Sequence, residues 1–154
     1  MTSITFRAAR REAVPAVVRL LADYALGAGR ERAVSPLPDS YWRAWEAIAA
    51  RPGCTLLLAI DDNDAVVGCL QLDLLPGLSQ QGMWRGQVEG VRVAADQRGR
   101  GLGAAMLRHA IGLARAAGCG SVQLTSNAAR TDARRFYERL GFVASHVGMK
   151  LNLK

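Results

Sequence analysis

A glycine-rich stretch near the middle of the chain has the residue types that bind phosphate groups. The segment Arg98–Ala104 reads RGRGLGA, and it lies between a strand pattern that ends at Val93 and a helix pattern that begins at Gly101. Backbone N–H groups at a helix start, without bulky side chains, attract anions together with the helix dipole. Arg98 and Arg100 add positive charge beside those donors. We therefore expect this segment to bind the pyrophosphate of a large cofactor.

Two common phosphate-binding motifs do not explain this segment. The spacing Gly99-x-Gly101-x-x-Ala104 formally matches the dinucleotide fingerprint, but there the first glycine follows its strand directly and the next strand ends in an acidic residue. Here several residues separate the strand pattern from Gly99, and the next strand pattern ends in Leu-Thr-Ser at 124–126. A Walker loop is excluded because the chain has no Gly-Lys-Ser/Thr sequence. A different kind of cofactor loop is therefore indicated.

The hydrophobic pattern around this segment predicts one mixed α/β domain that covers residues 1–154. Hairpins and one strand–helix–strand crossover indicate a mixed, mostly antiparallel sheet with helices on both faces. We expect strands at 4–8, 54–60, 65–75, 86–93 and 121–125, helices at 12–26, 41–50, 101–117 and 132–140, and two short strands within 142–153.

The charge of the chain limits the classes of partner. The net charge is +7, and the only lysines are Lys150 and Lys154, so 18 of the 20 basic residues are arginine. These arginines are scattered and aromatic residues make up only 6% of the chain, so we expect no nucleic-acid partner. No apolar run approaches the roughly 18 residues of a membrane span, so we expect no membrane contact.

The cysteines and the N-terminus predict a cytoplasmic protein. Cys54, Cys69 and Cys119 are odd in number, form no CxxC motif and lie in or beside apolar patterns. Free buried thiols are typical of a reducing compartment. Arginines interrupt the first dozen residues and no apolar stretch follows, which argues against a secretory leader. The two histidines are far apart, so we expect no metal site.

Two motifs resemble those of the GCN5-related N-acetyltransferase (GNAT) family. The segments Val91–Val93 and Arg98–Gly103 are similar to the family's acetyl-CoA signature, R/Q-x-x-G-x-G/A after a strand. Asn127, followed by FYERLGF at Phe136–Phe142, resembles the second signature. The order of elements also agrees, so the resemblance covers nearly the whole chain and is weakest over residues 24–53.

The resemblance implies an acetyl-CoA site between the fourth and fifth strands, which splay apart in this family. Backbone N–H groups of the glycine-rich segment would bind the pyrophosphate. The pantetheine arm would pair with the exposed fourth strand as an added strand does. Asn127 would contact the same arm, although a role as a helix cap or turn residue stays open. The implied cofactor residues are Val91, Val93, Arg98, Gly99, Arg100, Gly101, Leu102, Gly103, Ala104 and Asn127.

Acetyl transfer to an amine needs a base and an acid. Strand alternation predicts residues 87, 89, 91 and 93 on one face, and several polyamine-type members of the family carry a carboxylate at the position of Glu89. Glutamate is a weak base for an amine, so Glu89 would need burial or a water relay, and a solvated or ion-paired residue is the alternative. The resemblance implies Tyr137 as the acid that protonates the CoA sulfur, with a core aromatic as the alternative. No cysteine is placed for a covalent acyl-enzyme, so direct attack is favoured.

The acceptor is expected to be a primary amine of a small molecule. In this family the variable region between the first two helices and the loop before the central strand build its site, which suggests Tyr24, Trp42 and Trp84 as lining residues, with packing roles as the alternative. An acetyltransferase for protein or peptide amines and an inactive CoA-binding regulatory module stay open. The resemblance and the two expected C-terminal strands suggest a homodimer.

Overall fold

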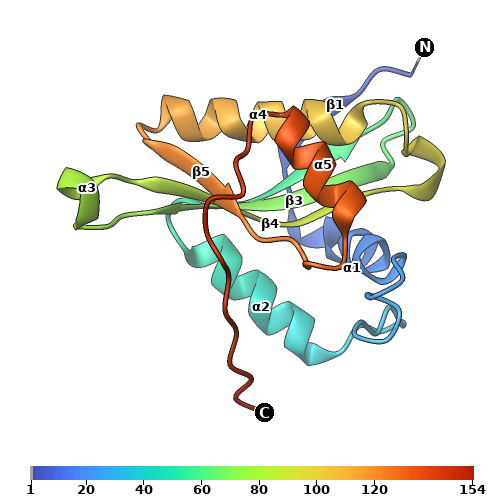
Figure 1. The fold of residues 1–154 in the computed structure, drawn as a ribbon. Helices are drawn as coiled ribbons and strands as arrows, with labels where there is room; N and C mark the ends of the chain where they lie inside the picture. The colour runs from blue at the N-terminus through green and yellow to red at the C-terminus, as the bar shows by residue number, and fades with distance from the viewer. Residues whose placement is uncertain (1) are drawn as a thin grey trace.

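Strands and helices follow one another in the predicted order as far as residue 141. The computed structural model describes residues 2–154. The strands are β1 (Thr5–Ala8), β2 (Cys54–Ile60), β3 (Val66–Leu75), β4 (Arg85–Val93) and β5 (Ser121–Leu124). The α-helices are α1 (Val14–Ala22), α2 (Asp39–Ala50), α3 (Ser79–Gly82), α4 (Leu102–Ala116) and α5 (Thr131–Arg139), with 3-10 turns at Arg11–Ala13 and Ala95–Gln97. The expected mixed α/β fold is confirmed (Figure 1).

The strands form one sheet in the order β1-β2-β3-β4-β5. Neighbouring strands are antiparallel from β1 to β4. A turn joins β2 to β3 and a longer loop joins β3 to β4, so these strands form hairpins, whereas α1 and α2 lie between β1 and β2 in the chain. β5 is parallel to β4, and α4 makes the crossover between them. The sheet is therefore mixed and mostly antiparallel, as the hydrophobic pattern predicts.

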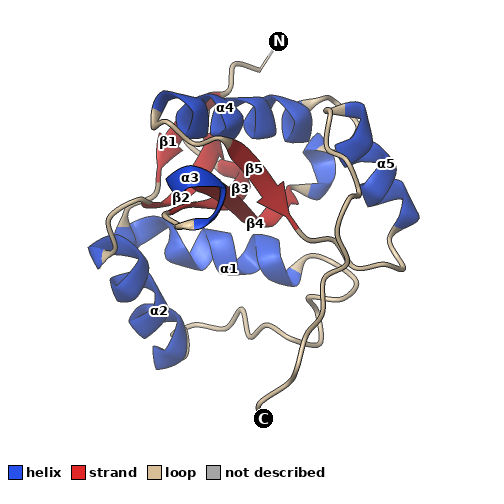
Figure 2. Ribbon diagram, turned by 60° about the vertical axis from the view of Figure 1, so that its left-hand side comes forward, coloured by secondary structure: helices blue, strands red, loops and turns tan. Residues whose placement is uncertain are grey.

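Helices cover both faces of this sheet. α4 and α5 lie on one face, and α1 and α2 lie on the other (Figures 1 and 2). The core under α4 contains Leu57, Leu70, Leu72, Val88, Leu102, Met106 and Leu107. A second cluster under α1 contains Val17, Leu20, Leu58, Ile60 and Cys69. Alternate residues of β2 contribute to the two clusters in turn, which is the two-residue period of a strand buried on both faces.

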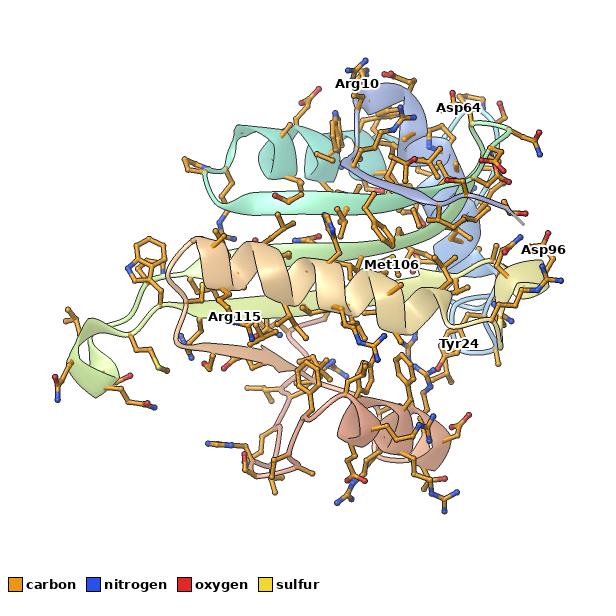
Figure 3. The ribbon with its side chains drawn as sticks, turned by 90° about the horizontal axis from the view of Figure 1, so that it is seen from above. Arg10, Tyr24, Asp64, Asp96, Met106 and Arg115 are labelled. Atoms are coloured by element: carbon orange, nitrogen blue, oxygen red, sulfur yellow. The ribbon has the colours of Figure 1, made fainter. Side chains whose placement is uncertain are left out.

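α4 forms where the apolar positions repeat with the helical period. Met106, Leu107, Ala110 and Ala114 are fully buried against the sheet, and Figure 3 shows Met106 on this helix. The helix ends before Gly118, whose φ of 88° is a left-handed conformation that glycine adopts without strain. The sheet therefore holds the N-terminus of α4, next to the glycine-rich segment, in a fixed position.

The C-terminal segment differs from the prediction. The two strands expected within 142–153 are wrong, because residues 142–154 form no strand in this single chain. The backbone bonds there are local, from Phe142 N to Tyr137 O (3.1 Å) and from Ser145 N to Val143 O (2.9 Å). A strand needs the backbone of a neighbour, and this segment passes the end of β5 without pairing before it extends toward the C-terminus (Figure 1).

Two smaller differences from the prediction concern the end of α1 and the loop between β3 and β4. The helix expected over 12–26 ends at Ala22, and residues 23–30 continue as turns. The loop between β3 and β4 contains the short helix α3, in which Gln80 and Gln81 have positive φ of 51° and 60°. Both differences lie outside the sheet, where short-range turn bonds compete with helix bonds.

Candidate active site

A β-bulge interrupts β4 at Gly90. Between the register pairs Gln71–Glu89 and Cys69–Arg92, β4 contains one more residue than β3. Gly90 has a φ of 62°, in the left-handed region that favours glycine. A bulge re-aims the side chains that follow it. The faces of β4 therefore exchange at this residue.

The bulge corrects the predicted orientation of the candidate base. The common face expected for alternate residues of 87–93 is wrong. Val91 and Val93 pack against the core beneath α4. Glu89 lies on the opposite face, because its partner in β3 is two residues from Cys69, which packs among residues of α1. Glu89 is exposed there, so it meets solvent on the side of the sheet that α1 and α2 cover.

β4 and β5 pair over only part of the length of β4. The parallel ladder ends at the pair Val88–Leu124, whereas β4 continues to Val93. The expected separation of the fourth and fifth strands is therefore confirmed. The backbone N–H groups of Val91 and Val93 have no strand partner on this side and can pair with an extended ligand, whereas their carbonyl oxygens accept from Arg92 Nη1 and Arg98 Nε.

The glycine-rich segment fits a pyrophosphate. Gly99 and Gly101 have φ of 76° and 81°, and Gly101 is the N-cap of α4. No side chain caps this helix, so its first N–H groups stay available to a ligand. A Cβ on Gly99 or Gly101 would meet no atom within 4 Å, so open space lies beside both residues. Leu102 is buried and anchors the first turn.

Arg98 fastens this segment to the end of α1. Its Nε donates to Val93 O (3.1 Å), its Nη2 donates to Asp23 O (2.9 Å), and Nη2 also lies 3.8 Å from a carboxylate oxygen of Asp23. These contacts order the turn that follows β4. The side chain of Arg98 thus positions the backbone donors, while Arg100 is exposed.

Asn127 shapes the turn between β5 and α5. Its Oδ1 accepts a hydrogen bond from Ala129 N (3.0 Å), and its backbone oxygen accepts one from Arg130 N (2.9 Å). The turn role that the sequence left open is confirmed. The side-chain amide nitrogen takes no part in this turn, so it can still donate to a ligand.

Tyr137 lies on α5 with its ring among other aromatic rings. Its centroid is 5.2 Å from that of Phe136 and 5.9 Å from that of Phe142, both in edge contacts. Burial raises the pKa of the Tyr137 hydroxyl above its ordinary value, and the charges of Arg130 and Arg92 oppose that shift. The hydroxyl therefore keeps its proton at neutral pH, as an acid catalyst must.

Tyr24, Arg92 and Arg130 meet beside Tyr137, and the sequence predicted a role for Tyr24 alone. The guanidinium carbons of Arg92 and Arg130 each lie 4.6 Å from the ring centroid of Tyr24. Tyr24, labelled in Figure 3, was expected to line an acceptor site, but the two arginines carry no sequence signal of their own. They come from β4 and from the turn before α5, and only the tertiary structure brings them together.

Polar side chains form part of the sheet face beneath α2. Asp73 is only 6% exposed. Its Oδ2 accepts from Gln71 Nε2 (3.0 Å), and its Oδ1 has no hydrogen-bond partner but lies 3.7 Å from Arg51 Nη1. Across the sheet, Gln123 Nε2 donates to Gln87 Oε1 (2.7 Å). The alternate polar residues in an otherwise apolar β3 were the sequence signal for this polar surface.

The three aromatic residues predicted to line the acceptor site do not converge. Trp84 is 46% exposed and directly precedes β4, whereas Tyr24 contacts Arg92 near the other end of that strand. At the rise per residue of a β-strand, Trp84 and Arg92 are about 25 Å apart. Trp42 packs beside α1, with the guanidinium of Arg11 4.4 Å from its ring. Of the three, Tyr24 is the one that contacts β4 beyond the end of its ladder with β5, through Arg92.

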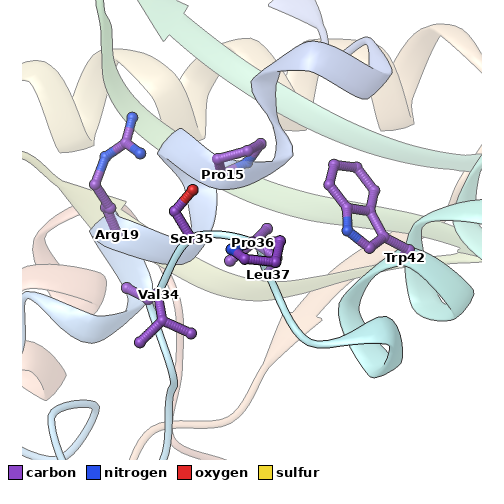
Figure 4. Close-up of a pocket in the computed structure, with 8 residues that line it drawn as sticks. Pro15, Arg19, Val34, Ser35, Pro36, Leu37 and Trp42 are labelled. Carbon is purple, nitrogen blue, oxygen red and sulfur yellow. The ribbon is translucent and has the colours of Figure 1, made fainter.

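A hollow of about 280 Å³ lies between α1, the following loop and α2. Figure 4 shows it, with Arg19 at one side and Trp42 at the other. It is lined by Pro15, Arg19, Ala33, Val34, Ser35, Pro36, Leu37 and Trp42. Its lining is mostly apolar and includes no carboxylate, so it offers no base for an amine.

The thiols of Cys54 and Cys69 offer no ready nucleophile. The three cysteines are free. Burial raises the pKa of the Cys69 thiol to about 12, and burial followed by the nearby Asp73 raises that of Cys54 to about 11. Among residues 2–154, no cluster of side chains has the composition of a metal site, and no helix has the length and apolar character to cross a membrane.

Comparisons with known proteins agree with this geometry. Residues 16–142 match the family model described as Acetyltransferase (GNAT) family. The chain is 36% identical over 84 residues to an aminoalkylphosphonate N-acetyltransferase of Salmonella typhimurium, a match covering 54% of each protein. It is 35% identical over 88 residues to a glucosamine 6-phosphate N-acetyltransferase of Trypanosoma brucei brucei, covering 57% of this chain and 58% of that protein. The chain thus spans little more than half the length of these curated relatives.

A solved structure matches over nearly the full length. The crystal structure of a transcriptional regulator from Bacillus halodurans C-125 is 42% identical, covers 98% of this chain with 100% of its own, and has a TM-score of 0.94. The arrangement of helices and sheet described above is therefore shared along both chains.

Proposed function

We infer the activity from one premise: the chain belongs to the acetyltransferase (GNAT) family. We propose that it is an acetyl-CoA-dependent N-acetyltransferase that acts on a primary amine of a small molecule by direct attack. The observation that carries the proposal is the separation of β4 from β5 directly before the glycine-rich helix start. One open strand edge and one anion-binding helix start match an acyl-pantetheine arm and its pyrophosphate.

Acetyl-CoA, when bound, supplies an activated acyl group on a thiol that leaves readily. The residues that would hold it are Gly99–Ala104 for the pyrophosphate and the backbone of Val91 and Val93 for the pantetheine arm. The amide nitrogen of Asn127 is a further donor to that arm. The N–H of Val91, just after the bulge, is the candidate donor to the thioester oxygen. Fixed backbone donors need no rearrangement during the reaction.

Glu89 is the candidate base. An ammonium group with an ordinary pKa near 10.4 costs about 4–5 kcal/mol to deprotonate at pH 7. The exposure of Glu89 on the face of α1 and α2 favours a relay through water over direct contact. The carboxylate would accept the amine proton through that water and attract the ammonium form of the acceptor.

Tyr137 is the candidate acid. Its raised pKa keeps a proton on the hydroxyl oxygen at neutral pH, and the departing CoA sulfur would receive that proton. The protonated thiols of Cys54 and Cys69 support direct attack by the amine, because a thiol is a poor nucleophile without its thiolate.

An acceptor screen tests the proposed reaction. The purified protein is incubated with acetyl-CoA and a panel of small primary amines, and the release of free CoA is measured with a thiol reagent. Amines that carry a phosphate or phosphonate group belong in the panel, because the names of the two N-acetyltransferase relatives specify such acceptors. Lysine peptides test the alternative of a protein acceptor. CoA release with peptides alone would overturn the small-molecule proposal.

Replacing Glu89 by glutamine should lower kcat/KM at neutral pH by roughly 10²–10⁴, because the variant keeps the shape of the side chain but loses the carboxylate that accepts the proton. Steady-state rates with an acceptor found in the screen check this expectation. Glu12→Gln removes an exposed carboxylate outside the separated strands and serves as the control. An unchanged rate for Glu89→Gln would show that another group, or water alone, accepts the proton.

We also propose that the protein forms a homodimer through its C-terminal arm, residues 143–154. Val147, Met149, Leu151 and Leu153 alternate with polar residues and are each at least 85% exposed. This alternation is the pattern of a strand with one apolar face. β5 lies at the edge of the sheet, so its outer side offers unpaired backbone groups. If the arm of one copy pairs with β5 of the other copy, the apolar face of the arm is covered and the unpaired backbone groups of β5 are bonded. In a two-fold dimer the second arm makes the same contact with the first copy.

Deleting residues 147–154 should convert the dimer to a monomer, as measured by sedimentation velocity at high micromolar concentration. Met149→Asp should have the same effect, because it places a charge on the apolar face of the arm. Asn152→Asp adds the same charge on the other face and should leave the dimer intact. A wild-type monomer at that concentration, or a dimer that survives the deletion, would refute this assembly.

One alternative function has an observation in its favour. The similar Bacillus halodurans protein is described as a transcriptional regulator, and this chain carries a net charge of +7. We expect no duplex DNA binding at moderate salt, because the arginines are scattered along the chain. The free thiols and the proposed acetyl transfer are those of a cytoplasmic protein, which is the location we propose. DNA binding at moderate salt, with CoA binding but no acetylated product, would favour a regulatory module instead.

A further inference from the structure

Arg92 and Arg130 hold two positive charges that no carboxylate among the described residues neutralises. Both guanidinium groups lie 4.6 Å from the ring centroid of Tyr24 and are partly buried. Neither forms an ion pair with a carboxylate among residues 2–154. Two like charges beside one ring are unfavourable without an anion, so the cluster has the charge balance of an empty anion site.

The hydrogen-bond donors of these arginines are also largely free. Nη1 of Arg92 donates to Val91 O (2.8 Å), but its Nε is buried without a partner. A guanidinium stacked on an aromatic ring keeps its N–H groups in its own plane, where they can bind an oxyanion in a bidentate way. Tyr24 thus orients the two groups, and no hydrogen bond within residues 2–154 uses Nη2 of Arg92 or the guanidinium of Arg130.

Arg92 lies on the same face of the sheet as Glu89, and the ring of Tyr24 joins it to Arg130. Arg92 is paired with Cys69 and Glu89 with Gln71, and these two partners are separated by one residue on β3. Two residues along a strand span about 7 Å. An acceptor whose amine lies at Glu89 would therefore reach the arginines with a group only a few bonds away from that amine.

We propose that Arg92 and Arg130 bind a phosphate or phosphonate group on the acceptor, so that the substrate class is short amines with such a dianionic group. This inference rests on the proposed acetyl transfer for the position of the amine. A phosphate group carries −1.5 to −2 charges at neutral pH and presents three acceptor oxygens, which match two guanidinium groups better than one carboxylate does. The phosphates of CoA are the other source of the same chemistry, and the experiment separates the two.

Calorimetry with methylphosphonate tests the site without any reaction. The wild-type protein should bind this probe, and Arg130→Gln should weaken binding about 10- to 100-fold, the loss expected for one charge-assisted contact. Arg92→Lys keeps the charge but loses the planar fork, and it should also weaken binding. Arg135→Gln removes an exposed arginine of α5 and is the matched control, with affinity unchanged. Absence of binding to the wild type, or equal affinity in all variants, would overturn the proposal.

Two further measurements identify the source of the phosphate. The affinity of Arg130→Gln for acetyl-CoA should equal that of the wild type, and a parallel loss would assign the arginines to CoA and overturn the proposal. In the acetylation assay, Arg130→Gln should raise KM for O-phosphoethanolamine but not for n-propylamine. If no amine is acetylated while methylphosphonate still binds through both arginines, the proposed reaction fails and the anion site stands.

Discussion

Replacing Tyr137 by phenylalanine should lower kcat by roughly 10²–10⁴, the usual contribution of one acid or base. The variant keeps the ring and its edge contacts with Phe136 and Phe142, so the fold and the affinity for acetyl-CoA should change little. It loses only the hydroxyl, whose proton burial retains at neutral pH. Single-turnover rates at saturating acetyl-CoA, together with the dissociation constant of acetyl-CoA, separate a loss of chemistry from a loss of binding.

Tyr41→Phe is the matched control for this prediction. The hydroxyl of Tyr41 donates to Glu31 Oε1 and accepts from Arg32 N, both at 2.9 Å. Its removal should lower the free energy of unfolding by about 1–2 kcal/mol while kcat stays within about twofold. Wild-type turnover in Tyr137→Phe would assign this tyrosine to the core, and water or the product amine would then have to supply the proton.

Replacing Gly101 by aspartate should abolish measurable binding of acetyl-CoA. The new carboxylate would stand at the N-terminus of α4, where the backbone donors are expected to meet the pyrophosphate, and would repel it. The side chain has space, since a Cβ at this position meets no atom within 4 Å, so the chain should still fold. Isothermal calorimetry with CoA and a thermal unfolding curve measure the two effects separately.

Gly118→Asp supplies the control for backbone strain. Gly118 lies at the other end of α4, with a φ of 88° close to the 81° of Gly101, and a Cβ there also meets nothing within 4 Å. Both variants therefore have a similar conformational cost, on the order of 1–2 kcal/mol. Only Gly101→Asp should lose CoA binding, and equal CoA affinity in the two variants would refute the phosphate-binding role of the segment.

The bulge at Gly90 is a feature of β4 that the sequence alone did not predict. The strand itself was predictable from its apolar alternation, and the glycine was visible in the sequence. Whether an isolated glycine in a strand forms a bulge depends on the register with its neighbour, here β3. That register is set by long-range pairing, so the change of face between Glu89 and Val91 could not be read from the order of residues.

The C-terminal arm is a second such case. Its alternation from residue 147 to 153 predicts a strand, and the single chain gives it no neighbour to pair with. Period-two patterning specifies which side chains share a face, but hydrogen bonds to another strand make that segment part of a sheet. The pattern was therefore informative about an interaction surface and wrong about the structure of the isolated chain.

By itself, the sequence determined the features that depend on neighbours in the chain. These are the helical period of 102–116, the hairpins, and the glycine-rich turn that opens α4, because local backbone preferences and amphipathic spacing decide them. Only the tertiary structure decided that Tyr24, Arg92, Arg130 and Tyr137 meet at the separation of β4 and β5. Those residues span more than 100 positions, and their contacts follow from how α1, β4 and α5 pack together. Side chains so distant in sequence share a site only after the sheet and its helices have fixed their relative positions.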